Sequence, residues 1–329
     1  MTPRAPRPTT RLLQRLSRAL KRHLPQAIKG DDRSVHQARV TSRRLREAVP
    51  VLATGLKGSK AGKARRKIRR LTRALGTVRE LDVTRLLLDE LARSPHVSRS
   101  AVEDVRARVI AERDARRKVM LQRLERVNTD KLGKRLESVS AAVQGATDEP
   151  WRKALAARLL ARGRRLSEAM DAAGHMYAPE RLHAVRIAAK KLRYGLELAA
   201  GSGVNEAAAH VSTIKRAQDM LGKLHDLQVL QAHVAAVQAD PESNRAQSRE
   251  TMEDLARHIE DQCRHLHGRY VALLPALRDL VLAVRKTIVP QLARSARRAP
   301  AVKMGLARPD RGAALHGRSK NARSIASDR

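Results

Sequence analysis

The amino-acid sequence predicts an all-α protein built as two helical bundles by internal duplication. Apolar residues recur every three or four positions along most of the chain, and no segment alternates in the way a β-strand would. Aromatic residues are almost absent, with one Trp, three Tyr and no Phe among 329 residues. The core must therefore consist of small aliphatic side chains, which suits close-packed helices. Two sequence blocks occur twice in the same order, which is typical of a duplicated structural unit.

The duplicated blocks keep nearly the same spacing in the two halves. The first block is VHQARVTSRRLREAVPVL at 35–52 and LHAVRIAAKKLRYGLELA at 182–199. The second block is IRRLTRALGTVRELDV at 68–83 and IKRAQDMLGKLHDLQV at 214–229. The two copies of the first block are offset by 147 residues and those of the second by 146. The repeated unit is therefore the whole arrangement of helices and not a single helix.

Helix start and stop signals divide the first half of the chain. A first helix is predicted at 9–24, capped by Thr9 or Thr10 and interrupted by Pro25. A second helix begins near Ser34 and carries the first block, and the small basic stretch that follows it is predicted to be a loop. Further helices are predicted at 63–91, 98–124 and 130–143.

The second half repeats this order after a boundary at 147–150. Its helices are predicted at 151–173, 179–200, 206–239, 242–272 and 275–289. After Pro290 the apolar periodicity ends, and the remaining residues are rich in Arg and Lys with only Asp310 and Asp328 as acids. The predicted organisation is an N-terminal extension (1–8), a first helical half (9–146), a second helical half (150–289) and a disordered basic C-terminal tail (290–329).

The charge of the chain predicts a polyanionic partner. Lys and Arg number 69 against 33 Asp and Glu, which gives a formal net charge of +36. Nucleic acid, an anionic membrane surface and inorganic polyphosphate are the candidates. The lack of aromatics disfavours base stacking on single strands, and the lack of any apolar run of about 18 residues disfavours a membrane span and integral membrane contact. The single cysteine, Cys263, excludes an internal disulfide and is compatible with a cytoplasmic setting.

The first block places cations on one face of a helix in both halves. At about 100° per residue, the side chains of His36, Arg39, Arg43 and Arg46 fall within about 80° of one another. The matched residues in the second half are His183, Arg186, Lys190 and Arg193, and Lys191 matches Arg44. Arg suits phosphate because its planar guanidinium donates two hydrogen bonds at once. These two basic faces are the predicted anion-binding surface.

The second block carries cations opposite an apolar stripe. Ile68, Leu71 and Leu75 form the stripe in the first half. The cations on the other side are Arg66, Arg69, Arg70 and Arg73. Their counterparts in the second half are Lys215, Arg216 and Lys223, where Asp219 dilutes the charge. The alternative interpretation is that these cations form the solvated exterior of an ordinary helix. For the cations of the second block, both interpretations stay open.

Neither catalysis nor metal binding is predicted. Cations flank both His36 and His183, and no HxxxH or HxxE arrangement accompanies either of them. The acids Glu80, Asp82 and Asp226 follow Leu-Gly steps, and we expect them to hold Arg side chains through ion pairs rather than to catalyse a reaction. No cofactor is implied.

The two doubled blocks resemble the CHAD family, the conserved histidine α-helical domain, over about 8–288. The resemblance implies two bundles related by a pseudo-two-fold axis, with basic helices lining a central groove or pore. It also implies binding of inorganic polyphosphate and a cytoplasmic location at polyphosphate granules. Carried over to this sequence, it marks as binding residues His36, Arg39, Arg43, Arg44, Arg46, Arg69, Arg70, Arg73, His183, Arg186, Lys190, Lys191, Arg193, Lys215 and Arg216. Glu80 stands where the family usually has Asp, and Gln228 differs from the matched Asp82.

Two other functions stay open at this point. A nucleoid- or RNA-associated protein would use phosphate contacts without reading bases, and the basic tail is a candidate for nucleic acid. An enzyme acting on phosphate chains would need a metal-binding cluster of carboxylates, which the repeated blocks lack. Oligomeric state is not indicated.

Overall fold

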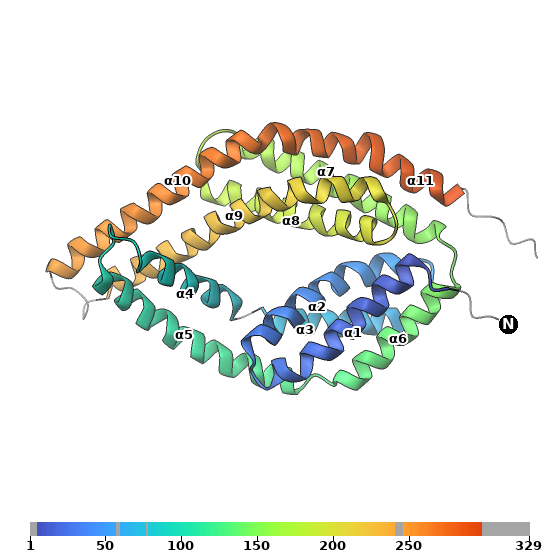
Figure 1. The fold of residues 1–329 in the computed structure, drawn as a ribbon, viewed down its shortest axis with the longest axis horizontal. Helices are drawn as coiled ribbons and strands as arrows, with labels where there is room; N and C mark the ends of the chain where they lie inside the picture. The colour runs from blue at the N-terminus through green and yellow to red at the C-terminus, as the bar shows by residue number, and fades with distance from the viewer. Residues whose placement is uncertain (1–4, 57–59, 77, 241–245, 298–329) are drawn as a thin grey trace, which may run out of the picture. The chain divides into compact units, whose positions relative to one another are not determined.

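The computed structural model describes residues 5–56, 60–76, 78–240 and 246–297, and all regular structure in these ranges is helical (Figure 1). This confirms the predicted all-α class, whereas the internal duplication stays a prediction. The first half contains α1 (Pro8–Ile28), α2 (Asp32–Leu52), α3 (Lys60–Ala74), α4 (Arg79–Leu91), α5 (Arg99–Glu125) and α6 (Thr129–Gly145). The second contains α7 (Glu149–Ala173), α8 (Pro179–Gly201), α9 (Asn205–Gln238), α10 (Ala246–Ala283), a π-helical turn (Val284–Ile288) and α11 (Val289–Arg297).

Each half is built on neighbouring antiparallel helices. α1 packs on α2 and α6 in the first half, while α8 packs on α7 and α9 in the second, and α9 also packs on α10. The buried positions are mostly Leu, Val, Ile and Ala, as the composition predicts, and Leu45, Ile68 and Leu192 are fully buried. The halves meet where α2 contacts α7 and α8, and where α4 and α5 run beside α9 (Figure 1).

The predicted single helix at 63–91 is wrong, because the chain forms two helices there. α3 ends at Ala74 and α4 begins at Arg79. Gly76 lies between them, and a Cβ atom at this position would come within 3.1 Å of both the Arg73 carbonyl oxygen and Arg39 Nη1. Arg39 Nη1 donates a hydrogen bond to the Leu75 carbonyl oxygen at 3.0 Å, which satisfies one acceptor left free at the end of α3.

Prolines end fewer helices than the sequence predicts. α1 continues through Pro25 to Ile28, since Leu24 and Ala27 are buried on either side of it. The helix beyond Pro290 runs to Arg297 with Leu292 fully buried, so the first part of the predicted tail is ordered helix. The π-helical turn lies directly before Pro290, where a regular turn would clash with the proline ring.

The start of α1 also differs from the prediction. Pro8 occupies the first turn and Arg7 is the N-cap residue, so Thr9 and Thr10 are buried inside the helix and do not cap it. Residues 1–4 of the predicted N-terminal extension, residues 57–59 of the predicted loop and residues 298–329 of the predicted tail lie outside the described residues. None of the described helices is both long and apolar enough to cross a membrane.

Candidate functional site

A basic pocket of about 580 Å³ lies between α2 and α4 of the first half and α8 and α9 of the second. Eight Arg or Lys side chains line it, together with two histidines, and only three carboxylates are present. The cationic and histidine residues of this basic pocket are His36, Arg39, Arg43, Arg44, Arg79, Arg186, Lys190, Arg193, Lys223 and His225. The three acids are Glu80, Asp219 and Asp226. The excess of positive charge suits an anionic ligand.

The pocket brings together many of the residues predicted from the first block. Those that line it are His36, Arg39, Arg43, Arg44, Arg186, Lys190 and Arg193. They meet because α2 and α8 bury their apolar faces, with Leu45 on one helix and Leu192 on the other, and present their basic faces to the same space. The predicted residues that do not line it are Arg46, Arg66, Arg69, Arg70, Arg73, His183, Lys191, Lys215 and Arg216.

Arg39 and Arg43 are charges held in the pocket without a carboxylate partner. Neither forms an ion pair in the part of the chain that the structure describes. Burial, followed by the nearby charges of Arg43 and Arg79, lowers the pKa of Arg39 to about 10. Burial also lowers the pKa of Arg43. Both residues stay protonated at neutral pH, so the free pocket carries a positive charge that is only partly solvated.

Tyr194 and Glu197 of α8 contact three Arg side chains of the pocket wall. The Tyr194 ring lies 5.6 Å from the guanidinium of Arg43 and 5.5 Å from that of Arg193, within cation–π range. Glu197 pairs with Arg44 at 3.6 Å and with Arg193 at 3.5 Å. The Arg44–Glu197 pair therefore joins α2 to α8, whereas the Arg193–Glu197 pair lies within α8, and the charge of both Arg side chains is partly neutralised.

The histidines lie in two different settings. His36 lines the pocket directly, whereas His183 lies behind His225, with 3.2 Å between their Nδ1 atoms. Burial, reinforced by Arg79 and Arg39, lowers the pKa of His36. Burial, reinforced by His225 and Arg186, lowers the pKa of His183.

The acids near the pocket have separate roles. Asp82 Oδ1 accepts a hydrogen bond from Arg113 Nε at 2.7 Å, which is the ion-pairing role expected from the sequence. Glu80 Oε1 lies 3.7 Å from His225 Nε2, and the hydrogen bond from His225 lowers the pKa of Glu80. Burial raises the pKa of Asp226, which lines the pocket. Protonation of Asp226 is therefore easier than that of an ordinary aspartate when an anion enters.

The cations of α3 lie outside the pocket. Arg66, Arg69, Arg70 and Arg73 are exposed, because α3 buries Ile68 and Leu71 on its other side. Partial burial, followed by Arg135 and Lys131 of α6, lowers the pKa of Lys67 on the same helix. This surface is a second concentration of positive charge, separate from the basic pocket.

Three basic pocket residues, Arg79, Lys223 and His225, were absent from the predicted binding residues. Arg79 and His225 occupy the same position in the two copies of the second block, three residues after Gly76 and Gly222. Both lie in the pocket wall. Aligning the second block as closely as the first would have found them, because each copy has a basic residue there.

The described residues contain no group of three or more His, Cys, Asp or Glu side chains arranged to hold a metal ion. The fold and the pocket together define an all-helical protein with a basic pocket between two helical halves. The profile of the CHAD domain family matches residues 11–235, which is most of the chain, and the protein belongs to this family.

Comparison with solved structures finds two similar chains. PptA from Streptomyces chartreusis is similar in fold, with a TM-score of 0.59 and 13% sequence identity over 82% of this chain and 100% of PptA. The CHAD domain from the plant Ricinus communis gives a TM-score of 0.49 at 20% identity, over 89% of this chain and 92% of that domain. At these identities the likeness to PptA concerns the fold alone. No curated protein sequence matches the chain.

Proposed function

We propose that this protein binds inorganic polyphosphate in the basic pocket and does not alter it chemically. The observation that carries the proposal is the pair Arg39 and Arg43, which are partly buried beside other cations and lack a carboxylate partner among the described residues. Holding such charges together is unfavourable unless an anion neutralises them. Phosphate groups provide that charge and accept the two parallel hydrogen bonds that a guanidinium donates.

The shape of the site favours a thin, flexible polyanion. The pocket encloses about 580 Å³, and Arg39 and Arg43 in its wall are partly buried. A polyphosphate chain has charge at every unit and no bases or sugars to accommodate. Duplex DNA is a rigid rod whose phosphates lie on its outer surface, so it would reach exposed cations better than enclosed ones. Association with polyphosphate granules in the cytoplasm follows from this proposal.

Nucleic acid is the second candidate, because of the exposed cations of α3. Arg66, Arg69, Arg70 and Arg73 form no ion pair among the described residues and lie outside the pocket. Such a face can contact phosphates of a duplex without reading its bases.

A competition experiment distinguishes the two candidates. Fluorescently labelled polyphosphate is bound to the protein at fixed salt and displaced by unlabelled polyphosphate or by duplex DNA at equal phosphate concentration. We expect polyphosphate to displace the label at least roughly tenfold more effectively, and its affinity to fall steeply with added salt because several phosphates are contacted. Equal displacement by DNA would favour the nucleic-acid function, and affinity that is insensitive to salt would mean that few phosphates are bound.

A further inference from the structure

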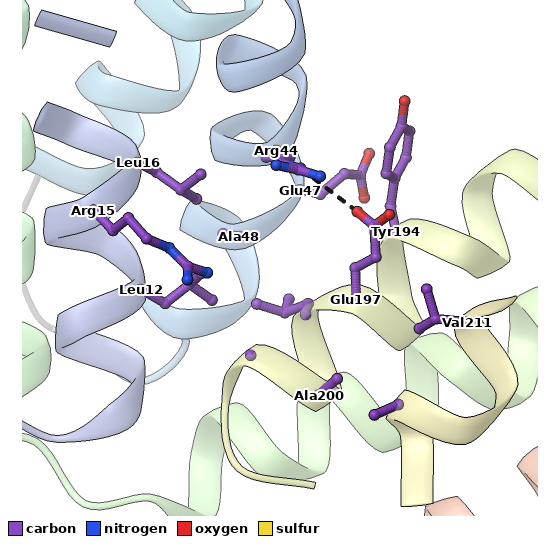
Figure 2. A pocket seen from close by; sticks show the side chains of 13 residues that line it. Leu12, Arg15, Leu16, Arg44, Glu47, Ala48, Tyr194, Glu197, Ala200 and Val211 are labelled. Atoms are coloured by element: carbon purple, nitrogen blue, oxygen red, sulfur yellow. Dashed lines mark ion pairs between the residues drawn. The ribbon is translucent and has the colours of Figure 1, made fainter. Parts of the chain in front are cut away.

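A second cavity, the α1–α8 pocket, lies between α1, α2, α8 and α9 (Figure 2). Its volume is about 430 Å³, which is in the range of sites for small organic ligands. Most of its wall is apolar, with Leu12 and Leu16 from α1, Leu198 from α8 and Val211 from α9. This lining differs from that of the basic pocket, although the two cavities share Arg44 and Tyr194.

The charges around the α1–α8 pocket leave one cation without a partner. Glu47 pairs with Arg162 of α7, and Glu197 pairs with Arg44 at 3.6 Å. Arg15 forms no ion pair with any carboxylate that the structure describes. Figure 2 shows Arg15 on the α1 side of the space, with Glu197 and Val211 on the other side. A single free guanidinium therefore faces walls that are otherwise apolar or already neutralised.

From this combination we propose that the α1–α8 pocket binds a small amphiphilic anion. The apolar body of such a ligand would contact Leu12, Leu16 and Val211, and its carboxylate, sulfonate or phosphate group would accept hydrogen bonds from Arg15. Polyphosphate has no apolar part to fill this space, so the site goes beyond the proposed function and does not depend on it. A helix of a partner protein does not fit inside this cavity, because a helix is about 10 Å across. Only a few of its side chains would enter.

Titration with 1-anilinonaphthalene-8-sulfonate tests the proposal, because this dye combines an apolar body with one negative charge and fluoresces in apolar surroundings. We expect saturable binding of one dye molecule per chain. Arg15→Gln should weaken it roughly tenfold, the effect of removing a hydrogen bond to a charged group. Arg18→Gln is the matched control, since Arg18 is an exposed cation of the same helix that does not line the pocket, and it should leave binding unchanged. Octanoate should displace the dye far better than neutral 1-octanol.

Substitutions that fill the cavity test the proposal independently of Arg15. Ala200→Leu places a larger side chain in the pocket and should abolish dye binding, and Ala208→Leu, at an exposed lining position, serves if the first variant does not fold. Unchanged dye binding in both variants would overturn the proposal. So would displacement of the dye by polyphosphate together with its loss in an Arg39→Gln, Arg186→Gln variant, because the dye would then occupy the basic pocket. A dimer in light scattering that fails to bind the dye would show instead that a second copy covers the site.

Discussion

The central residue of the site is Arg39, which both shapes the pocket and supplies charge to it. Its Nη1 atom donates to the Leu75 carbonyl oxygen at the end of α3, while the guanidinium lines the pocket. Burial and neighbouring cations lower its pKa to about 10, so the free protein bears an electrostatic cost at this point. A phosphate group would relieve that cost, which is the physical reason to expect affinity from this residue.

The histidines predict a pH dependence of binding. The pKa values of His36 and His183 are both lowered from the ordinary value of 6.5, mainly by burial, so both rings are neutral in the free protein at pH 7. A bound polyanion favours the imidazolium and raises these pKa values, and binding then takes up protons. Affinity for polyphosphate should therefore strengthen as pH falls from about 8 to about 6. Isothermal titration of the wild type and of the His36→Gln, His183→Gln variant measures this, and the variant should show a flatter dependence.

Without ligand, the free energy of unfolding should change in the opposite direction to the affinity as pH falls. The unfolded rings, with pKa values near 6.5, bind protons more readily than the folded rings. The free energy of unfolding should therefore decrease as pH falls below about 6.5. If the double variant loses thermal stability at pH 8 and binds with the same pH dependence as the wild type, the histidines act only as packing residues.

At the residue scale, the sequence predicts which cations share a face of α2 or of α8. It does not predict the complete lining of the basic pocket. Helical spacing alone places Arg39 and Arg43 on one face, and the duplicated block places Arg186 and Lys190 on its equivalent. Periodicity shows which side of a helix is polar but not what lies opposite it. For that reason it could not show that Arg70 and Arg73 are exposed outside the pocket, or that His183 lies behind His225.

At the element scale the end of α3 is held by a glycine that has no equivalent constraint in the second half. A Cβ atom at Gly76 would lie 3.1 Å from Arg39 Nη1, whereas one at Gly222 would meet nothing within 4 Å. Gly76→Ala should displace Arg39 and lower polyphosphate affinity roughly fivefold, the equivalent of about one hydrogen bond. Gly222→Ala is the comparison variant, at the matched position of the pocket wall. It leaves Arg39 in place, so affinity should fall less than in Gly76→Ala, and stability should rise by about 0.5–1 kcal/mol because Gly222 is inside α9.

Affinity measurements and thermal melts on these two variants decide the matter. Equal effects of both substitutions on affinity would show that the contact between Gly76 and Arg39 does not position the binding site. A melting temperature that is unchanged by Gly76→Ala, together with unchanged affinity, would show that the end of α3 adjusts without cost.

The helices were largely predictable, but their ends were not. Periodicity located α5, α6 and α8 within a few residues, because each buries a regular apolar stripe. Periodicity predicted a single helix in place of α3 and α4, because their apolar stripes continue in phase across Gly76. The sequence also predicted helix ends at Pro25 and Pro290. Both helices continue past these prolines, because burial of Ala27 and Leu292 outweighs the lost hydrogen bond.

At the scale of the whole molecule, the described fold extends through α11 and defines where the chain can be shortened. α11 packs on α7, and its Leu292 is fully buried. Deleting 298–329 should leave the melting temperature unchanged, because that segment has little apolar sequence to bury. Deleting 291–329 should cost about 2 kcal/mol or more, since it removes the buried leucine. Equal melting temperatures for the two truncations would show that α11 contributes nothing to stability.

The pocket between the halves is the central claim, and comparing two paired substitutions tests it most directly. Arg39→Gln with Arg186→Gln removes one charge from each wall of the basic pocket, while Arg66→Gln with Arg70→Gln removes the same net charge from the outside of α3. With both variants shown to be folded by circular dichroism, their affinity for polyphosphate is measured at physiological salt. We predict that the pocket variant loses at least roughly tenfold in affinity and the outer variant less than about threefold. A larger loss in the outer variant would contradict the account and place polyphosphate on α3.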